Sequence, residues 1–339
     1  MAKTGIVCTI GPATDTEQGI RQLVENGMTI ARCNCSHGTP EQTRTKINML
    51  KKVRETLPSN KRFQIMLDTK GPDVRIGTFA NEKVMLKDGQ EFTLTTTKVV
   101  GDETRVHVDF DKLPTKVKAG QLLLLNDGMI RMTVMNVTDT DVVCAVDMGG
   151  ELKDRKTMFA PGCELDLVFL SDADKADLKV GVETGVDMVA ASFVGNAGNV
   201  NEMRDYMKTI GTPPAIMSKI ESVQGIKNLE EIAAVSQSFM VARGDLGVEY
   251  PVEQVPAMQK LIISTANKHG KFVVCATEMM ESMITKSRPT RAEVADVYQA
   301  VLDGADAVMT SAETAVGKYP FLTIDYMRKI LEEAEKVKG

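Results

Sequence analysis

The segment GIVCTIGPATDTEQGIRQLVENGMTIARCNCS, residues 5–36, has the pattern of a β-strand, an amphipathic helix and a second β-strand. Its two ends are short apolar runs, and the apolar residues between them have helical spacing. We expect the helix to begin with a capping box formed by Thr14 and Glu17 and to end at Gly27. A strand–helix–strand unit of this kind predicts a fold in which parallel strands alternate with helices.

The same alternation occurs along most of the chain. A helix with Thr39 as N-cap and Pro40 in its first turn precedes a third strand at residues 63–69. Five more strands are expected in DMVAASFV (187–194), AIMSKIE (215–221), SFMVARGD (238–245), KFVVCATEM (271–279) and ADAVMTSAE (305–313). Eight strand–helix units are the count of a (β/α)8 TIM barrel. A doubly wound open sheet is the competing fold, but no GxGxxG motif follows the first strand.

Residues 70–167 interrupt this alternation. They show little helical periodicity and contain short apolar runs such as KVMLKDGQEFTLTT (83–96), separated by Asp-Gly and Gly-Gly turn signals. We therefore expect an all-β lid domain at residues 70–167, inserted after the third strand of a barrel that consists of residues 1–69 and 168–339.

The composition excludes several classes of protein. The chain is 43% hydrophobic and 26% charged with a formal net charge of −5, which is typical of a soluble globular protein and does not suggest nucleic acid as a general partner. No apolar run is long enough to cross a membrane. The 6 cysteines include no CxxC pair, so we expect reduced thiols and a cytoplasmic protein. The 21 methionines and the absence of tryptophan predict a core filled partly by thioethers.

Polar residues collect at the predicted carboxyl ends of the strands, where the active sites of such barrels lie. They are Arg32, Asn34, Ser36, Asp68, Thr69, Lys70, Arg75, Lys219, Glu221, Arg243, Gly244, Asp245, Thr277 and Glu278. Carboxylates, a lysine and arginines at one mouth of a barrel predict a site for a divalent cation and an anionic substrate. Oxygen ligands with few histidines or cysteines favour Mg²⁺ or Mn²⁺ over zinc.

The spacing Cys-x-Cys-x-His within residues 33–37 suggests a different metal site. Alternate side chains of a strand point to opposite faces, however, so Arg32, Asn34 and Ser36 share one face and the two cysteines share the other. We therefore expect the cysteines to pack against the outer helices rather than to bind a metal.

Several motifs resemble those of one enzyme family. The segments CTIGPAT, RCNCSHG, LDTKGPDVR, SKIES, VARGDLGVE, ATEMMESM, RPTRAEVADV and VLDGADAVM are similar, in order and spacing, to the successive motifs of pyruvate kinases. The resemblance extends from residue 4 to about residue 325. It implies a Mg²⁺-dependent transfer of a phosphoryl group from phosphoenolpyruvate to ADP, giving pyruvate and ATP in glycolysis, under a mobile β-domain lid.

The resemblance also implies roles for individual residues. Glu221 and Asp245 would hold the Mg²⁺ or Mn²⁺ ion, and Lys219 would neutralise the charge of the migrating phosphoryl group and the enolate. Substrate contacts are implied for Arg32, Lys219, Gly244, Asp245 and Thr277, nucleotide contacts for Asn34, His37, Arg75 and Lys156, and K⁺ contacts for Asn34, Ser36, Asp68 and the carbonyl of Thr69. Arg32 and Thr277 would also take part in catalysis, Thr277 on the proton path to pyruvate.

The sequence departs from the family pattern at the cysteines of RCNCSHG, in MTSAETA and at three further positions. Asp73 stands where K⁺-dependent members have Glu and K⁺-independent members have Lys, and Thr157 replaces a lid glycine. Glu278 replaces a Gln and adds a negative charge near an anionic substrate, which is expected to raise the Michaelis constant.

The family usually carries a C-terminal effector-binding domain, which is absent after the last predicted helix. The sequence leaves open whether this is a natural short form or a truncation. We expect no allosteric control through that domain, and a homo-oligomer formed through barrel surfaces.

Two alternative functions remain at this point. One is a metal-dependent aldolase or lyase of the phosphoenolpyruvate/pyruvate barrel class, which would have no use for the lid or the nucleotide residues. The other is a non-catalytic relative that binds a ligand or a partner.

Overall fold

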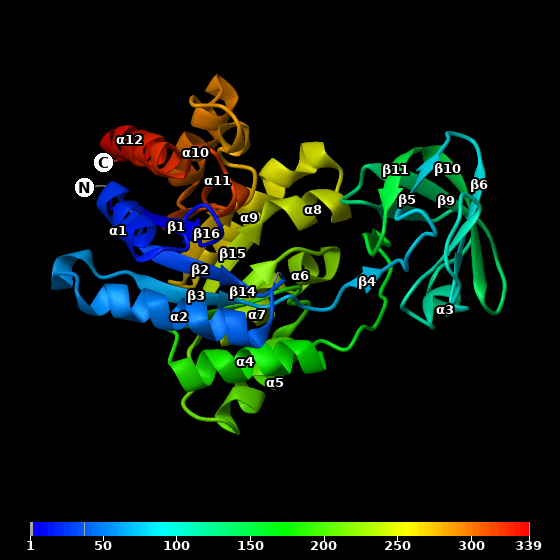
Figure 1. The fold of residues 1–339 in the computed structure, drawn as a ribbon, viewed down its shortest axis with the longest axis horizontal. Coiled ribbons are helices and arrows are strands. Elements are labelled where there is room, and N and C mark those ends of the chain that lie inside the picture. Colours follow the sequence, from blue (N-terminus) through cyan, green and yellow to red (C-terminus); the bar gives the residue numbers. More distant parts are fainter. Residues whose placement is uncertain (1–2, 37, 339) are drawn as a thin grey trace. The chain divides into compact units, whose positions relative to one another are not determined.

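The computed structural model describes residues 3–36 and 38–338 and divides into two compact units (Figure 1). The barrel unit comprises the chain up to Gly71, Phe169–Gly244 and the chain from Val255 onward. The inserted unit comprises Pro72–Val168 together with the short segment Asp245–Gln254.

The barrel unit contains a closed ring of parallel strands. In sequence order they are β1 (Gly5–Thr9), β2 (Ile30–Asn34), β3 (Gln64–Asp68), β13 (Met188–Ala191), β14 (Ala215–Ile220), β15 (Ser238–Ala242), β16 (Phe272–Ala276) and β17 (Ala307–Thr310). The ring closes where β1 pairs with β17, with Gly5 opposite Ala307. The prediction of a (β/α)8 barrel with a β-domain after its third strand is therefore confirmed.

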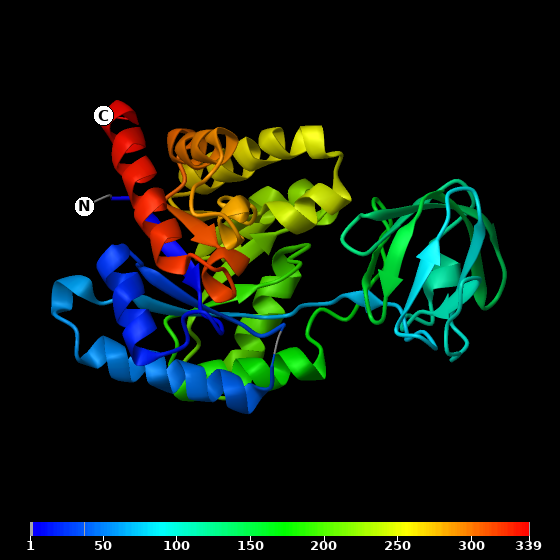
Figure 2. The same ribbon diagram turned by 45° about the horizontal axis from the view of Figure 1, so that its top comes forward.

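Helices lie outside this ring (Figure 1). They are α1 (Glu17–Asn26), α2 (Pro40–Glu55), α4 (Asp172–Thr184), α5 (Ala197–Lys208), α6 (Val223–Lys227), α7 (Leu229–Val235), α9 (Val255–Lys268), α10 (Arg291–Asp303), α11 (Ala312–Ala315) and α12 (Pro320–Lys338), with 3-10 turns at Ser59–Lys61 and Glu281–Ile284. Helix α8 (Arg243–Glu249) begins in the barrel unit and continues into the segment grouped with the inserted unit, which also contains a 3-10 turn at Val252–Gln254. The last helix, red in Figure 2, lies beside the start of the chain, where the Glu335 carboxylate accepts hydrogen bonds from the backbone N–H groups of Lys3 (2.9 Å) and Thr4 (2.6 Å). Within residues 3–36 and 38–338, no helix is both long and apolar enough to cross a bilayer.

The predicted start of α1 was wrong by two residues. The N-cap is Thr16, whose hydroxyl accepts a hydrogen bond from the Gly19 N–H (3.0 Å). The Thr14 hydroxyl instead donates to the Thr314 carbonyl (3.0 Å), a tertiary contact that local spacing does not reveal. The predicted end at Gly27 is confirmed by its positive φ of 121°, which favours glycine.

The predicted beginning of α2 is confirmed in full. The Thr39 hydroxyl accepts from the Gln42 N–H (3.4 Å), while the Gln42 side chain accepts from the Thr39 N–H (2.9 Å), and Pro40 occupies the first turn. This reciprocal capping box satisfies two backbone donors that would otherwise have no partner within the helix.

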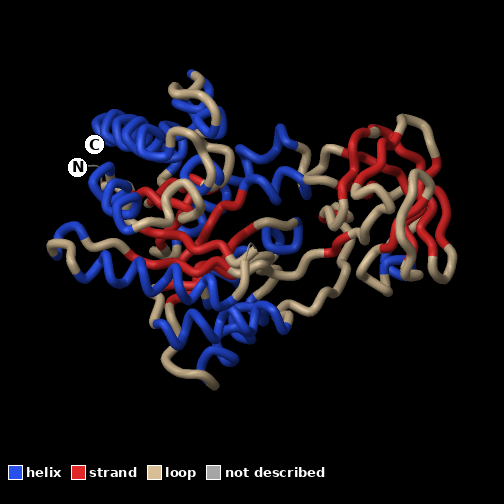
Figure 3. The backbone as a smooth tube through the Cα atoms, in the orientation of Figure 1, coloured by secondary structure: helices blue, strands red, loops and turns tan. Residues whose placement is uncertain are grey.

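The inserted unit consists mainly of strands and loops (Figure 3). Its seven-stranded sheet has the order β4 (Val74–Arg75), β12 (Thr157–Phe159), β8 (Leu122–Leu125), β9 (Ile130–Val137), β10 (Asp141–Met148), β6 (Glu91–Thr95) and β7 (Arg105–His107), and β5 (Lys83–Leu86) pairs with β11 (Gly150–Lys153). One short helix, α3 (Leu113–Lys116), accompanies them. The unit has its own apolar core, which includes the fully buried Phe92, Leu123 and Met132.

Methionines fill much of the barrel interior, as the composition predicted. Met66, Met188, Met217, Met240 and Met309 belong to one buried apolar cluster contributed by five different strands. Because side chains of a strand alternate between faces, the residue two positions further along each strand also points into the barrel. On β3 and β14 the methionines Met66 and Met217 therefore lie one inward-facing position before Asp68 and Lys219.

Cys33 of β2 and Cys35, which follows the strand, are both buried, and Cys35 contacts the surrounding helices as predicted. Burial raises the pKa of Cys33 to about 12, and burial followed by the charges of Asp177 and Asp68 raises that of Cys35. The Cys35 thiol is hydrogen-bonded to Thr43 of α2 and lies beside Asp177 of α4. His37, the third member of the apparent metal motif, lies outside the described residues.

One buried carboxylate joins the two points at which the chain leaves and re-enters the barrel unit. Asp174 Oδ1 accepts a hydrogen bond from the N–H of Gly71, the last barrel residue before the insertion (3.0 Å). Its Oδ2 accepts from the hydroxyl of Ser171, the N-cap of α4 on the returning side (2.6 Å). The barrel itself therefore holds both ends of the insertion together.

We predict that Asp177→Asn stabilises the protein at pH 8, because burial and then the charge of Asp174 raise the pKa of Asp177 to about 6. Above pH 6 the folded state must bury this charge. The cost diminishes as the pH falls through 6 and disappears below the unfolded pKa, near 3.8. The gain in the free energy of unfolding should be on the order of 1 kcal/mol at pH 8 and should shrink toward pH 4.

Chemical denaturation at several pH values measures this difference. Asp172→Asn is the matched control, since Asp172 lies in the same helix with an exposed side chain. A variant at position 177 that is less stable than the parent protein at pH 8 would contradict the prediction.

Candidate active site

A buried cluster of four charged side chains occupies the carboxyl ends of β2, β3 and β14. Arg32 Nε is 2.6 Å from Asp68 Oδ2. Lys219 Nζ is 3.2 Å from Asp68 Oδ1 and 2.8 Å from Glu221 Oε1. Asp68 is 0% exposed, Glu221 1%, and Arg32 and Lys219 8% each, so these charges are compensated mainly by one another.

The two neighbouring cations keep Asp68 ionised. Burial raises the pKa of Asp68, but the opposing effects of Arg32 and Lys219 outweigh it and hold that pKa below its ordinary value. Arg32 also donates from its NH1 group to the Thr9 hydroxyl on β1 (2.9 Å). The site therefore presents Arg32 and Lys219 beside an Asp68 carboxylate that is ionised at neutral pH.

Ser192, which the sequence reasoning did not include, completes this cluster. Directly after β13, its hydroxyl accepts a hydrogen bond from Lys219 Nζ (2.7 Å) and donates to the Thr69 carbonyl (2.6 Å). The next residue, Phe193, donates its backbone N–H to Glu221 Oε2 (2.5 Å). The signal available in the sequence was a serine at the carboxyl end of the fourth strand, the position at which the other site residues were found.

The residues predicted to bind K⁺ lie at the ends of two neighbouring strands. Asn34 of β2 is the register partner of Asp68 of β3. The Asn34 side-chain oxygen accepts from the Ser36 N–H (3.0 Å), and Thr69 directly follows β3. The structure brings these oxygen-bearing residues to one edge of the barrel.

Thr277 is held in an unusual backbone conformation. Both Thr277 (φ 70°) and Glu278 (φ 53°) occupy the left-handed region, which costs residues with side chains about 1–3 kcal/mol each. Arg243 donates to the Thr277 carbonyl (2.6 Å), and the Thr277 hydroxyl accepts from the Gly244 N–H (2.8 Å). These contacts from the end of β15 compensate for the strain and fix the hydroxyl.

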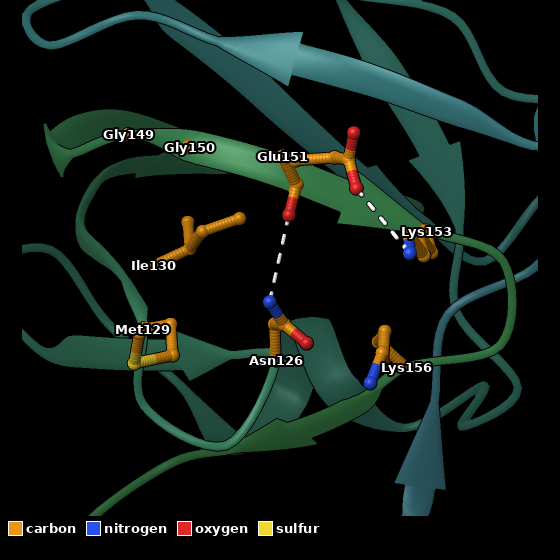
Figure 4. A pocket seen from close by; sticks show the side chains of 8 residues that line it. All are labelled: Asn126, Met129, Ile130, Gly149, Gly150, Glu151, Lys153 and Lys156. Atoms are coloured by element: carbon orange, nitrogen blue, oxygen red, sulfur yellow. Dashed lines mark hydrogen bonds and ion pairs between the residues drawn. The ribbon is translucent and has the colours of Figure 1, made fainter. Parts of the chain in front are cut away.

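Three further predicted residues, Arg75, Lys156 and Asp245, belong to the inserted unit. The Nε and NH2 groups of Arg75 both lie 2.6 Å from Asp73 Oδ2. Lys156 lines a hollow of about 340 Å³ within this unit (Figure 4). Its other lining residues are Asn126, Met129, Ile130, Gly149, Gly150, Glu151 and Lys153.

Comparisons with known proteins identify the family. A family model described as pyruvate kinase, barrel domain, matches residues 1–324. The chain belongs to the pyruvate kinase family. It is 41% identical over 336 residues to the pyruvate kinase of Thermotoga maritima, covering 99% of this chain and 72% of that protein.

Two further relatives show similar coverage. Identity is 43% to pyruvate kinase 1 of Trypanosoma brucei brucei (97% of this chain, 66% of the relative) and 43% to the pyruvate kinase of Dictyostelium discoideum (99% and 67%). The chain thus spans about two thirds of the length of these relatives. The predictions of a pyruvate kinase family enzyme and of its fold are confirmed, and the aldolase or lyase alternative is not favoured. The roles of individual residues stay predictions.

Pyruvate kinases are in general metal-dependent, and the donor set of the barrel unit fits an oxygen-preferring ion. Glu221 offers a buried carboxylate beside further carboxylate, hydroxyl and carbonyl oxygens. Among the described residues, no three His, Cys, Asp or Glu side chains are grouped as an all-protein metal cage. Mg²⁺ commonly uses only one or two carboxylates and completes its shell with water and substrate oxygens.

We predict that Asp68→Asn lowers the free energy of unfolding by about 3–5 kcal/mol at pH 7, because it leaves buried Arg32 and Lys219 with too little negative charge. Since the pKa of Asp68 is lowered, its stabilising effect is present above pH 3.8 and is lost as the pH falls below that value. The difference in the free energy of unfolding between Asp68→Asn and the parent protein should therefore decrease only below about pH 3.8.

Denaturant titrations at pH 7 and below pH 4 measure this effect. Asp205→Asn removes an exposed ion pair with Lys208 and should cost less than about 1 kcal/mol. If Asp68→Asn and Asp205→Asn lowered the free energy of unfolding equally at pH 7, the buried cluster would stabilise the protein no more than an exposed ion pair, and the prediction would be wrong.

Proposed function

We propose that this chain transfers the phosphoryl group of phosphoenolpyruvate to ADP at the carboxyl ends of its barrel strands, giving pyruvate and ATP. The observation that supports this most directly is the buried cluster of Arg32, Asp68, Lys219 and Glu221. Phosphoryl transfer requires positioning and compensating charge rather than a covalent nucleophile, and the cluster offers both.

Lys219 and Arg32 supply the positive charge in this proposal. Lys219 neutralises the migrating phosphoryl group and the enolate oxygen that remains on the substrate, and Arg32 contacts the phosphoryl group. Both cations are held by carboxylates in a nearly dry environment, where little reorganisation is needed as charge moves.

Thr277 and Gly244 serve the other end of the substrate. The Gly244 N–H and the Thr277 hydroxyl, now bonded to each other at 2.8 Å, would receive the substrate carboxylate together with the Asp245 backbone. The Thr277 hydroxyl would then belong to the proton path that converts enolpyruvate to pyruvate. The strained turn at residues 277–278 supports this role, because such strain often accompanies functional sites.

Two metal ions assist the proposed reaction. Glu221 and Asp245 would hold Mg²⁺ or Mn²⁺, which, when bound, polarises the phosphoryl and enol oxygens. Asn34, Ser36, Asp68 and the Thr69 carbonyl would hold K⁺. Asp73 retains the negative charge of the K⁺-dependent members, and its carboxylate is bound by Arg75.

The nucleotide would be contacted by Asn34, His37, Arg75 and Lys156. Arg75 is preorganised for phosphate, since Asp73 and the Arg155 carbonyl (2.9 Å) fix its guanidinium. We further infer a cytoplasmic protein that forms homo-oligomers through barrel surfaces. Large apolar side chains exposed on the barrel unit, Leu261, Phe272, Leu302 and Leu322, support the second inference.

A coupled assay for pyruvate tests the proposal. The protein is mixed with phosphoenolpyruvate, ADP and Mg²⁺, with and without K⁺. We expect ADP-dependent turnover that increases with K⁺. Turnover without ADP would support a lyase, and the absence of any turnover would support a non-catalytic relative.

We predict that Lys219→Met lowers kcat at least about a hundred- to a thousandfold, because it removes a preorganised charge from the transition state. The binding of Mn²⁺, followed by electron paramagnetic resonance, should be largely retained. Lys51→Met is the matched control, since the Lys51 ammonium binds the Thr184 carbonyl (2.7 Å) outside the cluster. Near-normal turnover of Lys219→Met would exclude the charge-neutralising role.

A further inference from the structure

We propose that Ser192 is a positioning residue for the Lys219 ammonium during phosphoryl transfer. The inference rests on the proposed function and adds to it a residue from the fourth barrel strand. Its basis is the direct contact between the Ser192 hydroxyl and the Lys219 ammonium at 2.7 Å.

Three oxygens determine the direction of the Lys219 side chain. An ammonium has three N–H donors, and Nζ of Lys219 contacts Ser192 Oγ, Glu221 Oε1 (2.8 Å) and Asp68 Oδ1 (3.2 Å). The two carboxylates balance its charge. The serine is the nearest of these three partners and follows β13, so it contacts the ammonium from a third strand end, beside those of β3 and β14.

The hydroxyl of Ser192 is itself fixed as an acceptor. Its single proton has the Thr69 carbonyl at 2.6 Å as its nearer acceptor and Asp68 Oδ1 at 3.4 Å as the other, and an ammonium can only donate, so a lone pair faces Lys219. The Ser192 backbone N–H also donates to the Thr69 hydroxyl (3.2 Å), which ties the residue to β3 at a second point. Because Ser192 is only 2% exposed, water has little access to replace this contact.

The same turn also orients the metal-binding carboxylate. Phe193 has a positive φ of 54° and points its N–H at Glu221 Oε2 (2.5 Å). Gly71 packs against this turn, and a Cβ atom there would lie 2.7 Å from the Ser192 Cβ. The turn at residues 192–193 thus holds Lys219 and Glu221 at once and is itself closely packed.

A purely structural role is the alternative, and the chain offers a control for it. Ser218 precedes Lys219 in β14, is fully buried, and forms a hydroxyl–hydroxyl hydrogen bond with Ser236 (2.6 Å). It therefore loses a buried hydrogen bond on substitution to alanine, as Ser192 does, but makes no contact with the ammonium. A decrease in kcat that Ser192→Ala and Ser218→Ala share would therefore reflect the loss of a buried hydrogen bond and of packing, and not the contact with Lys219.

The experiment compares Ser192→Ala, Ser192→Cys and Ser218→Ala with the parent protein in the pyruvate assay. Hydrogen bonds to charged groups are stronger than average, so both variants at position 192 should lose about ten- to a hundredfold in kcat. The Michaelis constant for phosphoenolpyruvate should change less than about threefold, and Ser218→Ala should keep kcat within about twofold. Thermal unfolding checks that all variants are folded.

Ser192→Cys keeps the shape of the side chain and leaves no cavity, although sulfur is somewhat larger than oxygen, and it replaces the hydroxyl by a poor acceptor. It therefore tests hydrogen bonding if the alanine variant does not fold. The inference is overturned if Ser192→Cys keeps parental kcat, or if Ser218→Ala loses as much activity as Ser192→Ala. An inactive parent protein would instead contradict the proposed function, and this is seen before any variant is compared.

Discussion

The mutual neutralisation of Arg32, Asp68, Lys219 and Glu221 is the interaction on which the site depends. Each side chain is almost fully buried, so loss of one member would leave a buried charge without its partner, which is strongly destabilising. That condition fixes the relative positions of the ends of β2, β3 and β14. The methionines of the barrel interior provide adaptable apolar packing, whereas the charged side chains must keep their ion-pair partners.

Much of this arrangement follows from periodicity alone. Alternating strand and helix patterns predicted the barrel and the point of the insertion, and the two-residue repeat of a strand assigned Arg32 to the interior and Cys33 to the helices. The N-cap of α1, by contrast, could not be assigned from the neighbouring residues alone. Thr14 and Thr16 both fit a cap, and the choice is made by the Thr314 carbonyl from the far end of the chain.

Other features depend on contacts that appear only when the barrel closes. Ser192 is an ordinary serine after an apolar run until β13 lies between β3 and β14, which brings its hydroxyl to Lys219. The left-handed backbone of Thr277 has no signal in its residue type, because Arg243, distant in sequence, compensates for it. The grouping of Asp245–Gln254 with the inserted unit likewise reflects packing rather than local pattern.

The two hydrogen bonds of the Asp174 carboxylate determine where the inserted unit leaves and re-enters the barrel unit. Because the barrel fixes both Gly71 and Ser171 through one carboxylate, the inserted unit is not needed to bring these two points together. The entropy of closing the intervening segment increases only slowly with its length. An inserted unit of another size would therefore leave and re-enter the barrel at the same two hydrogen-bonded points, and the entropic cost of closing the segment between them would change little.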